Sequence, residues 1–158
     1  MRIIAFDPGL RSLGVAVLDK DVYLATSKVP AKVPRPEAYG IQGDAVLRAV
    51  QRFKPDRICM EGPAYGAGGG RFNMEQLAVV RGLIEMVAWE YRQFEVIRVA
   101  PSAVKKHATG SGRATKAEVF SAMCDLAAAR NWTLPANEDE ADALALLLVT
   151  VGGAVNHD

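Results

Sequence analysis

Four acidic residues stand where a carboxylate can do chemistry. Asp7 ends an apolar run and precedes a Pro-Gly turn, and Glu61 follows the apolar "RICM" and precedes a glycine-rich loop. Carboxylates at the carboxyl ends of strands point into the crevice where open α/β sheets bind ligands. Asp139 and Asp142 are three residues apart in a helical pattern, which places their Cβ atoms roughly 5–6 Å apart. We interpret the four carboxylates as one site.

Structural roles for the same acids are the alternative. Asp-Pro-Gly is a common turn sequence. Acids in the first turn of a helix interact favourably with its dipole, and Asn137 with Glu140 has the pattern of a capping box. The dipole accounts for Asp139 better than for Asp142, because Asp142 faces a stripe that we expect to be buried. An unpaired carboxylate is costly there unless a cation meets it.

The type of donor indicates the kind of cation. Four carboxylates with no cysteine pair and no histidine in range favour Mg²⁺ or Mn²⁺ over zinc. Two such ions ~3.5–4 Å apart activate a water and stabilise the leaving oxygen when a phosphodiester is displaced in line. We therefore expect metal-dependent phosphodiester hydrolysis with two Mg²⁺ ions, Mn²⁺ being a substitute, at Asp7, Glu61, Asp139 and Asp142.

Two basic stretches without acids indicate a polyanionic partner. One is "SKVPAKVPRP", with Lys28, Lys32 and Arg35, and the other runs from residue 96 to 117. The basic residues of the second stretch and its histidine are Arg98, Lys105, Lys106, His107, Arg113 and Lys116. We expect the residues from Lys105 onward to contact DNA; solvated loops are the alternative.

The loop "GPAYGAGGGRF" does not match a nucleotide-binding motif. It lacks the Lys-Ser/Thr pair of a P-loop and the spacing of GxGxxG. We interpret it as a mobile loop that carries Arg71 and Phe72 past the site. If exposed there, Tyr65 and Phe72 would stack on unpaired bases or wedge a junction, at roughly 1–3 kcal/mol per stacked base. The alternative is that one or both rings pack into the protein body.

The chain pattern predicts five strands that position these residues. Apolar runs at residues 1–6, 13–18 and 22–29 are joined by turn sequences and indicate an antiparallel meander. "DRICME" and "FEVIRVAP" predict two further strands. Helical patterns alternate with these later strands. Together they predict an α/β fold, a mixed five-stranded sheet flanked by helices.

The predicted helices are four longer segments and one short piece. Pro30, Pro34 and Pro36 are expected to preclude regular structure before a helix over residues 37–53. A second helix, capped by Asn73, carries apolar residues as far as Tyr91. A short helical piece follows the fifth strand. Thr115 and Glu118 form a capping box for a helix to residue 130. The last helix, over residues 138–151, is apolar nearly all round and is expected to be buried and to end at a Gly-Gly pair.

Length and composition limit the possible classes of protein. The chain has 158 residues and a net charge of +1, and we expect one domain over residues 1–158. It contains no apolar run long enough to span a membrane and no N-terminal leader, so we expect a soluble cytoplasmic protein without membrane partners. Cys59 and Cys124 lack metal-ligand spacing, and we expect buried free thiols.

Four segments together resemble one protein family. They are "FDPGLRSLGVAVLD", "CMEGP", "PSAVKKHATGSGRATKAEV" and "DEADALALLL". In order and spacing, over most of the chain, they resemble the RuvC family of Holliday-junction resolvases, which have the ribonuclease-H-like fold. The resemblance is closer to compact phage-encoded members, which would act in the host cytoplasm. In this family an aromatic residue follows the second acid closely, whereas glycines intervene around Tyr65 here.

The resemblance implies a function and assigns residues to it. It implies a homodimer that resolves four-way DNA junctions by paired symmetric nicks during recombination and repair. The family's four metal-binding acids fall on Asp7, Glu61, Asp139 and Asp142. Its functional lysines fall on Lys105 and Lys116, which we count with these acids as catalytic.

Two other readings use the same residues differently. A ribonuclease acting on RNA or RNA–DNA hybrids needs the same acids, and only the basic segment argues against it. A junction-binding protein that does not cleave would use the basic segment alone. Four intact acids argue against that protein, since negative charge would repel phosphates.

Overall fold

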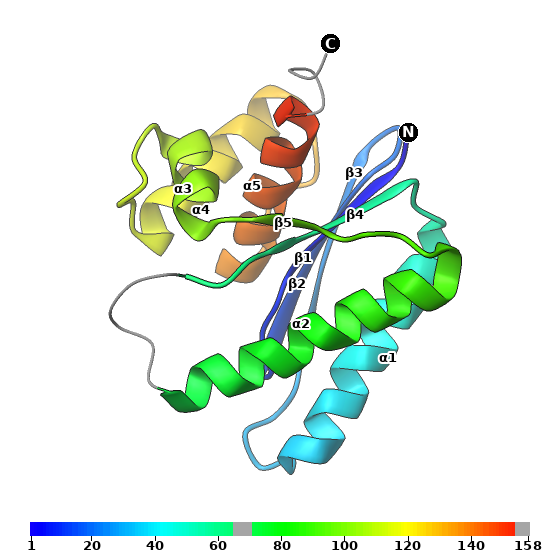
Figure 1. Ribbon diagram of the computed structural model, residues 1–158. Coiled ribbons are helices and arrows are strands. Elements are labelled where there is room, and N and C mark those ends of the chain that lie inside the picture. Colours follow the sequence, from blue (N-terminus) through cyan, green and yellow to red (C-terminus); the bar gives the residue numbers. More distant parts are fainter. Residues whose placement is uncertain (65–70, 154–158) are drawn as a thin grey trace.

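The computed structural model describes residues 1–64 and 71–153, except the side chains of residues 71, 72 and 153. An initial run of three strands is followed by alternating helices and strands and then by three consecutive helices (Figure 1). In chain order the elements are β1 (Ile3–Asp7), β2 (Ser12–Leu18), β3 (Val22–Lys28), α1 (Arg35–Phe53), β4 (Arg57–Glu61), α2 (Arg71–Arg92), β5 (Ile97–Val99), α3 (Pro101–Thr109), α4 (Lys116–Ala129) and α5 (Glu138–Gly153).

The strands form one mixed sheet in the order β3-β2-β1-β4-β5. β1, β2 and β3 pair antiparallel, as short turns between consecutive strands require. β4 pairs parallel with β1, and β5 pairs parallel with β4, each after a helix that returns the chain along the sheet. The predicted meander followed by parallel strands is confirmed, although β5 is shorter than the pattern "FEVIRVAP" indicated.

Helices cover both faces of this sheet. Figure 1 shows α1 and α2 on one side and α3, α4 and α5 on the other. Because side chains alternate along a strand, Ile4 and Phe6 of β1 enter the core beneath α1 and α2. Ile3 and Ala5 enter the second core, beneath α4 and α5. The same alternation directs Asp7 toward the α5 side of the sheet.

Helix α5 is buried along nearly its whole length, as predicted. Ala141 and the run from residue 143 to 147 are almost inaccessible. The predicted cap at its start is half formed: the Glu140 N–H donates to Asn137 Oδ1 at 2.9 Å, but the Glu140 carboxylate accepts from the Ala136 N–H at 2.8 Å. The helix ends at Gly153, within the predicted Gly-Gly pair.

Two predicted helix starts are wrong. α1 begins at Arg35, so Pro36 lies in its first turn. Proline is tolerated there because a first-turn N–H has no partner within the helix. α2 begins at Arg71, so Asn73 lies inside the helix and does not cap it. Both errors place the start of a helix too late.

Other local predictions are met more closely. Thr115 caps α4: its hydroxyl accepts from the Glu118 N–H at 3.2 Å, and Glu118 Oε2 accepts from the Thr115 N–H at 2.7 Å. Cys59 is a buried free thiol, whereas Cys124 is free but only half-buried. Of the helices in the described ranges, none has the length and apolar character needed to cross a membrane.

Candidate active site

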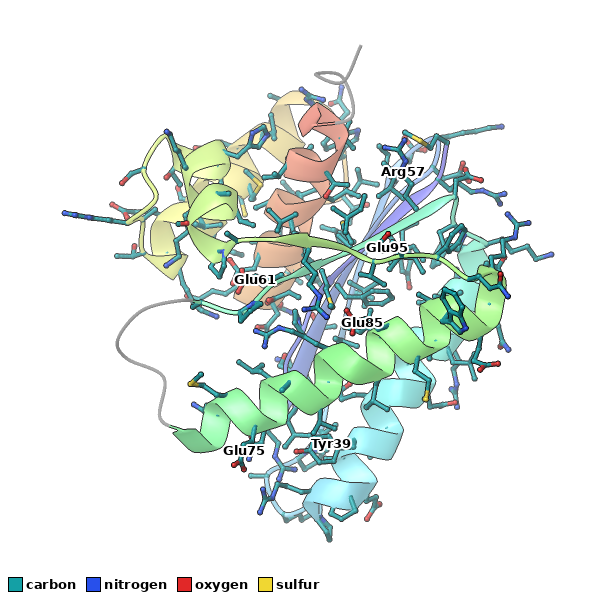
Figure 2. The ribbon with its side chains drawn as sticks, in the orientation of Figure 1. Tyr39, Arg57, Glu61, Glu75, Glu85 and Glu95 are labelled. Atoms are coloured by element: carbon teal, nitrogen blue, oxygen red, sulfur yellow. The ribbon has the colours of Figure 1, made fainter. Side chains whose placement is uncertain are left out.

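Asp7 and Glu61 lie at the ends of two neighbouring parallel strands. Phe6 of β1 pairs with Met60 of β4, so the next residue of each strand is one of the two acids. Figure 2 shows Glu61 at the end of β4, beside α3 and α5. The two carboxylates therefore meet at one edge of the sheet, as the predicted strand ends required.

Helix α5 begins directly above this edge. Gly14 of β2 is paired with Asp7. A Cβ atom on Gly14 would lie 2.2 Å from the carbonyl oxygen of Asp139 and 3.3 Å from the Cβ of Asp7. Only a residue without a side chain lets the first turn of α5 approach the sheet so closely. This contact brings Asp139 and Asp142 to Asp7 and Glu61, and we call these four residues the acidic cluster.

Two hydroxyl groups from the sheet hold the start of α5. The Ser12 hydroxyl of β2 donates to Asp139 Oδ2. The Thr26 hydroxyl of β3 donates to Glu140 Oε1 at 3.3 Å and accepts from the Asn137 amide at 3.0 Å. Sequence reasoning did not single out Ser12 or Thr26, because each contact joins residues more than 100 positions apart.

The acidic cluster is electrostatically strained. Burial raises the pKa of Asp7 well above its usual range, and the charges of Glu61, Asp142 and Asp139 raise it further. Burial and then Asp142 raise the pKa of Glu61. Burial also raises the pKa of Asp142. Too little positive charge surrounds these carboxylates to stabilise their ionised forms. An added cation would supply it.

Lys116 supplies part of that positive charge. Its Nζ lies 3.4 Å from Asp142 Oδ2, and the Asp142 side chain is only 17% exposed. Burial disfavours the charged ammonium, but the charges of Asp142, Asp7 and Asp139 outweigh burial and raise the pKa of Lys116. Lys116 therefore remains a cation at neutral pH, at the first position of α4.

The other predicted DNA-binding residues divide into three groups. Lys105 is half-buried in α3, and its charge opposes the rise that burial causes in the pKa of Glu61. It also lines a hollow of about 290 Å³ between the end of β4 and the start of α3. Lys106 and His107 of α3 and Arg113 of the loop after α3 form the second group, and all three are exposed. Tyr65 and the side chains of Arg71 and Phe72 lie outside the described residues.

Arg81 of α2 is a site residue that sequence reasoning missed. Its Nε donates to the Glu61 carbonyl at 3.2 Å, and its Nη2 donates to the Gly62 carbonyl at 3.3 Å. Its charge opposes the rise that burial causes in the pKa of Glu61, and burial lowers the pKa of Arg81 itself. An arginine in a helix pattern usually reads as a solvated residue, so its spacing gave no signal.

The donor chemistry of the acidic cluster fits a hard divalent cation. Carboxylate oxygens are the ligands that Mg²⁺ and Mn²⁺ prefer, and the raised pKa values of Asp7, Glu61 and Asp142 reflect a need for positive charge. The described residues contain no group of three or more His, Cys, Asp or Glu side chains drawn together tightly enough to form a ready-made cage.

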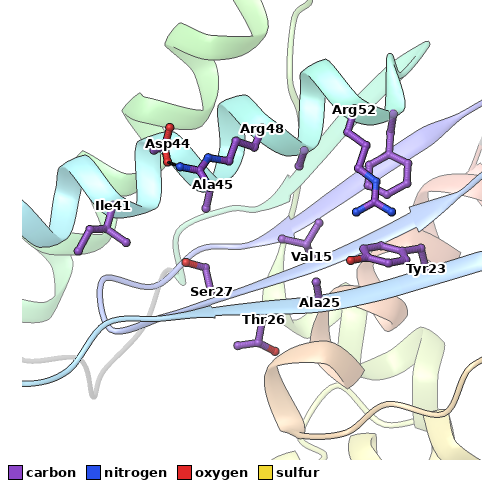
Figure 3. A pocket seen from close by; sticks show the side chains of 12 residues that line it. Val15, Tyr23, Ala25, Thr26, Ser27, Ile41, Asp44, Ala45, Arg48 and Arg52 are labelled. Atoms are coloured by element: carbon purple, nitrogen blue, oxygen red, sulfur yellow. Dashed lines mark ion pairs between the residues drawn. The ribbon is translucent and has the colours of Figure 1, made fainter.

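A second hollow lies away from the acidic cluster. It occupies about 500 Å³ between α1 and the edge strand β3 (Figure 3). The Arg52 guanidinium lies over the rings of Tyr23 and Phe53, at 5.1 and 5.0 Å from their centroids. Arg48 pairs with Asp44 at 2.7 Å on its rim. None of the four acids lines this hollow.

The sheet order, with acids at the ends of the central strands, defines the ribonuclease-H-like class of fold. Solved structures support this class. RuvC from Thermus thermophilus in complex with a Holliday junction substrate superposes with a TM-score of 0.79 at 24% identity, covering 98% of this chain and 94% of that one. The yeast mitochondrial Holliday junction resolvase Ydc2 gives a TM-score of 0.59 at 10% identity, over 93% and 76% of the two chains.

Sequence relatives identify the family. The family model for the crossover junction endodeoxyribonuclease RuvC matches residues 3–150, and the chain belongs to this family. RuvC from Prochlorococcus marinus subsp. pastoris is 32% identical over 156 residues, covering 94% of each protein. RuvC from Parafrankia sp. is 34% identical over 159 residues, covering 94% of this chain and 84% of the relative. Membership in this family implies a nuclease that depends on a divalent metal.

Proposed function

We propose that the chain is a structure-selective DNA endonuclease that resolves four-way junctions by paired symmetric nicks, acting in recombination and repair. The observation that carries this proposal is the meeting of Asp7, Glu61 and Asp142 with Lys116 at one edge of the sheet, in a chain of the RuvC family. Carboxylates and cations together suit a phosphodiester substrate, because the cations attract the phosphate while the carboxylates hold metal ions.

In the proposed mechanism, Asp7, Glu61, Asp139 and Asp142 hold two Mg²⁺ ions, with Mn²⁺ as a substitute. These ions supply water activation and stabilisation of the leaving oxygen. Lys116 is held at the edge of the site by Asp142, from which it can turn toward a phosphate oxygen. Lys105 contributes positive charge near Glu61. Arg81 fixes the backbone that carries Glu61.

The exposed basic residues fit the role of holding the DNA arms. Lys106, His107 and Arg113 lie on α3 and the loop after it, on the same side of the sheet as the acidic cluster. We propose that they contact phosphates, which positions the junction without reading its sequence. Tyr65, Arg71 and Phe72 follow Glu61 in the chain, and we propose that they contact the unpaired bases at the junction centre.

We also propose that one nuclease domain spans residues 1–158, works in the cytoplasm, and forms a homodimer through an apolar stripe on α2. This α2 stripe consists of Ala78, Val79, Gly82, Met86 and Trp89, all exposed. The 3-4-3 spacing of its last four members puts them on one face of the helix, as in helices that pack against a copy of themselves. Met86 is 56% and Trp89 57% exposed, and a Cβ on Gly82 would have no neighbour within 4 Å.

The test is Mg²⁺-dependent cleavage of an end-labelled four-way DNA junction. A linear duplex, a replication fork and an RNA–DNA hybrid are treated in parallel, each with the wild type and with Asp7→Asn. We expect paired nicks in the junction that the variant does not make. The variant should bind the junction as tightly as the wild type or more tightly, because it loses a metal ligand and a repulsive charge and keeps the basic segment.

The rival functions give different outcomes in the same experiment. Cutting confined to the hybrid would make the protein a ribonuclease. Tight junction binding without cutting by the wild type would make it an architectural protein. A circular dichroism spectrum of Asp7→Asn that matches the wild type is the control, since an unfolded variant would lose cleavage for an unrelated reason.

A further inference from the structure

We propose that Ser12 is a positioning residue that presets the Asp139 carboxylate for metal binding; this inference rests on the proposed function. Ser12 has no charge and no expected contact with DNA. Its hydroxyl nevertheless donates to Asp139 Oδ2, a carboxylate 127 residues away in sequence. Among the described residues, this is the only neutral side chain that hydrogen-bonds to a carboxylate of the acidic cluster.

The fold places Ser12 at Asp139 through the turn between β1 and β2. A Cβ on Gly9 would lie 2.2 Å from the carbonyl oxygen of Ser12, so this turn is tight. Ser12 precedes Gly14 by two residues and therefore faces the same side of the sheet, toward α5. Because Gly14 admits the backbone of Asp139, the carboxylate of Asp139 comes within reach of the Ser12 hydroxyl.

The hydrogen bond has a definite consequence for Asp139. It engages Oδ2 and restricts rotation of the carboxylate, which holds the remaining lone pairs of Asp139 in a fixed direction. A ligand oriented in advance loses less conformational freedom when the ion binds. Removing a hydrogen bond of this kind to a metal ligand typically lowers metal affinity or activity 10–100-fold.

Thr26 provides a matched control within the same structure. Its hydroxyl braces the same first turn of α5, but it contacts Asn137 and Glu140, which are not members of the acidic cluster. Thr26→Val therefore loosens the start of the helix without removing a hydrogen bond to the acidic cluster. A purely structural role for Ser12 would make Ser12→Ala and Thr26→Val behave alike.

The experiment measures Mg²⁺ and Mn²⁺ binding to the DNA-free protein by isothermal titration calorimetry, together with the Mg²⁺ dependence of junction cleavage. We expect Ser12→Ala to weaken metal binding about tenfold and to shift half-saturation of cleavage by Mg²⁺ equally. The KM for the junction should stay unchanged, and excess Mg²⁺ should restore kcat. Ser12→Thr keeps the hydroxyl and should restore metal affinity to within about threefold of the wild type.

Three results would overturn the inference. Ser12→Ala could bind Mg²⁺ as tightly as the wild type. Thr26→Val could lose as much metal affinity as Ser12→Ala, which would make the role structural. A wild type that neither binds Mg²⁺ nor cuts the junction would remove the proposed function and this inference together, whereas the first two results leave the proposed function standing.

Discussion

The Asp7 carboxylate makes the free energy of unfolding depend on pH in a way that one substitution can test. Its pKa is raised by burial and then by the charges of Glu61 and Asp142. Between the ordinary aspartate pKa of about 3.9 and this raised value, the folded protein binds a proton that the unfolded chain does not bind. Without a metal ion, the contribution of Asp7 to the free energy of unfolding therefore falls as the pH rises through this window.

Asp7→Asn should remove this contribution. In EDTA, we expect the variant to be more stable than the wild type at pH 8, by about 1.4 kcal/mol for each unit of pKa elevation. The difference should disappear as the pH falls below about 4, where Asp7 is protonated in both states. Urea unfolding of both proteins across this pH range measures it. A difference that does not vary with pH would contradict the raised pKa.

Gly14 makes a steric prediction. A Cβ there would lie 2.2 Å from the Asp139 carbonyl oxygen, so Gly14→Ala must push the start of α5 away from Asp7. We expect a loss of about 1–3 kcal/mol in the free energy of unfolding and a fall in cleavage larger than the fall in junction binding. Chemical denaturation and the cleavage assay measure the two effects.

Gly40→Ala is the matched control for Gly14→Ala. A Cβ on Gly40 would have no neighbour within 4 Å, and Gly40 lies inside α1. The control should gain about 0.5–1 kcal/mol, because alanine is the better helix former. Equal effects of the two substitutions would argue against the close approach of α5 to the sheet.

At the scale of single residues, the sequence predicts those residues whose role follows from the pattern of their sequence neighbours. Asp7 and Glu61 were expected together because each ends a strand, and the paired strands do end side by side. Ser12 and Arg81 could not be expected, because a hydroxyl or guanidinium acquires its partner only when distant elements pack. Their contacts depend on how α5 and α2 lie on the sheet.

Two adjacent lysines of helix α3 differ in solvent exposure. Lys105 is half-buried and near enough to Glu61 to oppose the rise that burial causes in the pKa of Glu61, whereas Lys106 is exposed. We expect Lys105→Ala to reduce kcat about tenfold, because it removes positive charge beside the reacting phosphate. Lys106→Ala should weaken junction binding and reduce the slope of log K against log salt by about 1, with kcat unchanged.

Single-turnover cleavage and salt-dependent binding measure the two lysine variants. Each variant serves as the control for the other, since both remove one lysine from the same helix. Identical effects would show that α3 contributes only general positive charge. Unchanged activity and unchanged binding in both variants would remove the case for this helix in DNA recognition.

Element boundaries show where sequence reasoning reaches its limit. Apolar runs, helical spacing and cap residues together indicated the helices and strands described here, because burial on one face leaves a regular pattern. The starts of α1 and α2 were placed too late, because Pro36 and Asn73 read as boundary residues but lie inside first turns. The start of α4 was right, because both partners of its capping box are local in sequence.

In our proposal, the two faces of the sheet have different roles, one in cleavage and the other in dimer formation. The α5 face carries the acidic cluster, and α2, on the other face, presents the α2 stripe to solvent. Trp89→Glu places a charge within the proposed dimer interface, at the C-terminal end of the α2 stripe. We expect the variant to stay folded but to sediment as a monomer, and its junction nicks to lose their pairing because each protomer then cuts alone.

Leu134→Glu is the control for the dimer prediction. Leu134 is 54% exposed, close to the 57% of Trp89, but it lies between α4 and α5 and not on α2. Analytical ultracentrifugation of both variants at equal concentration measures the effect. A Trp89→Glu protein that sediments with the wild type would place the dimer interface elsewhere.

The order of the acidic cluster along the chain has a consequence for biosynthesis. Asp7 and Glu61 emerge from the ribosome before Asp139 and Asp142, which belong to α5, the last helix described. A domain generally folds as a unit. Until α5 is made, one face of the sheet lacks the helix that covers it, and the proposed metal site lacks half of its ligands. The proposed site would become competent to cut only after Asp142 has been made and α5 has packed on the sheet, which protects nearby nucleic acid from a partly made enzyme.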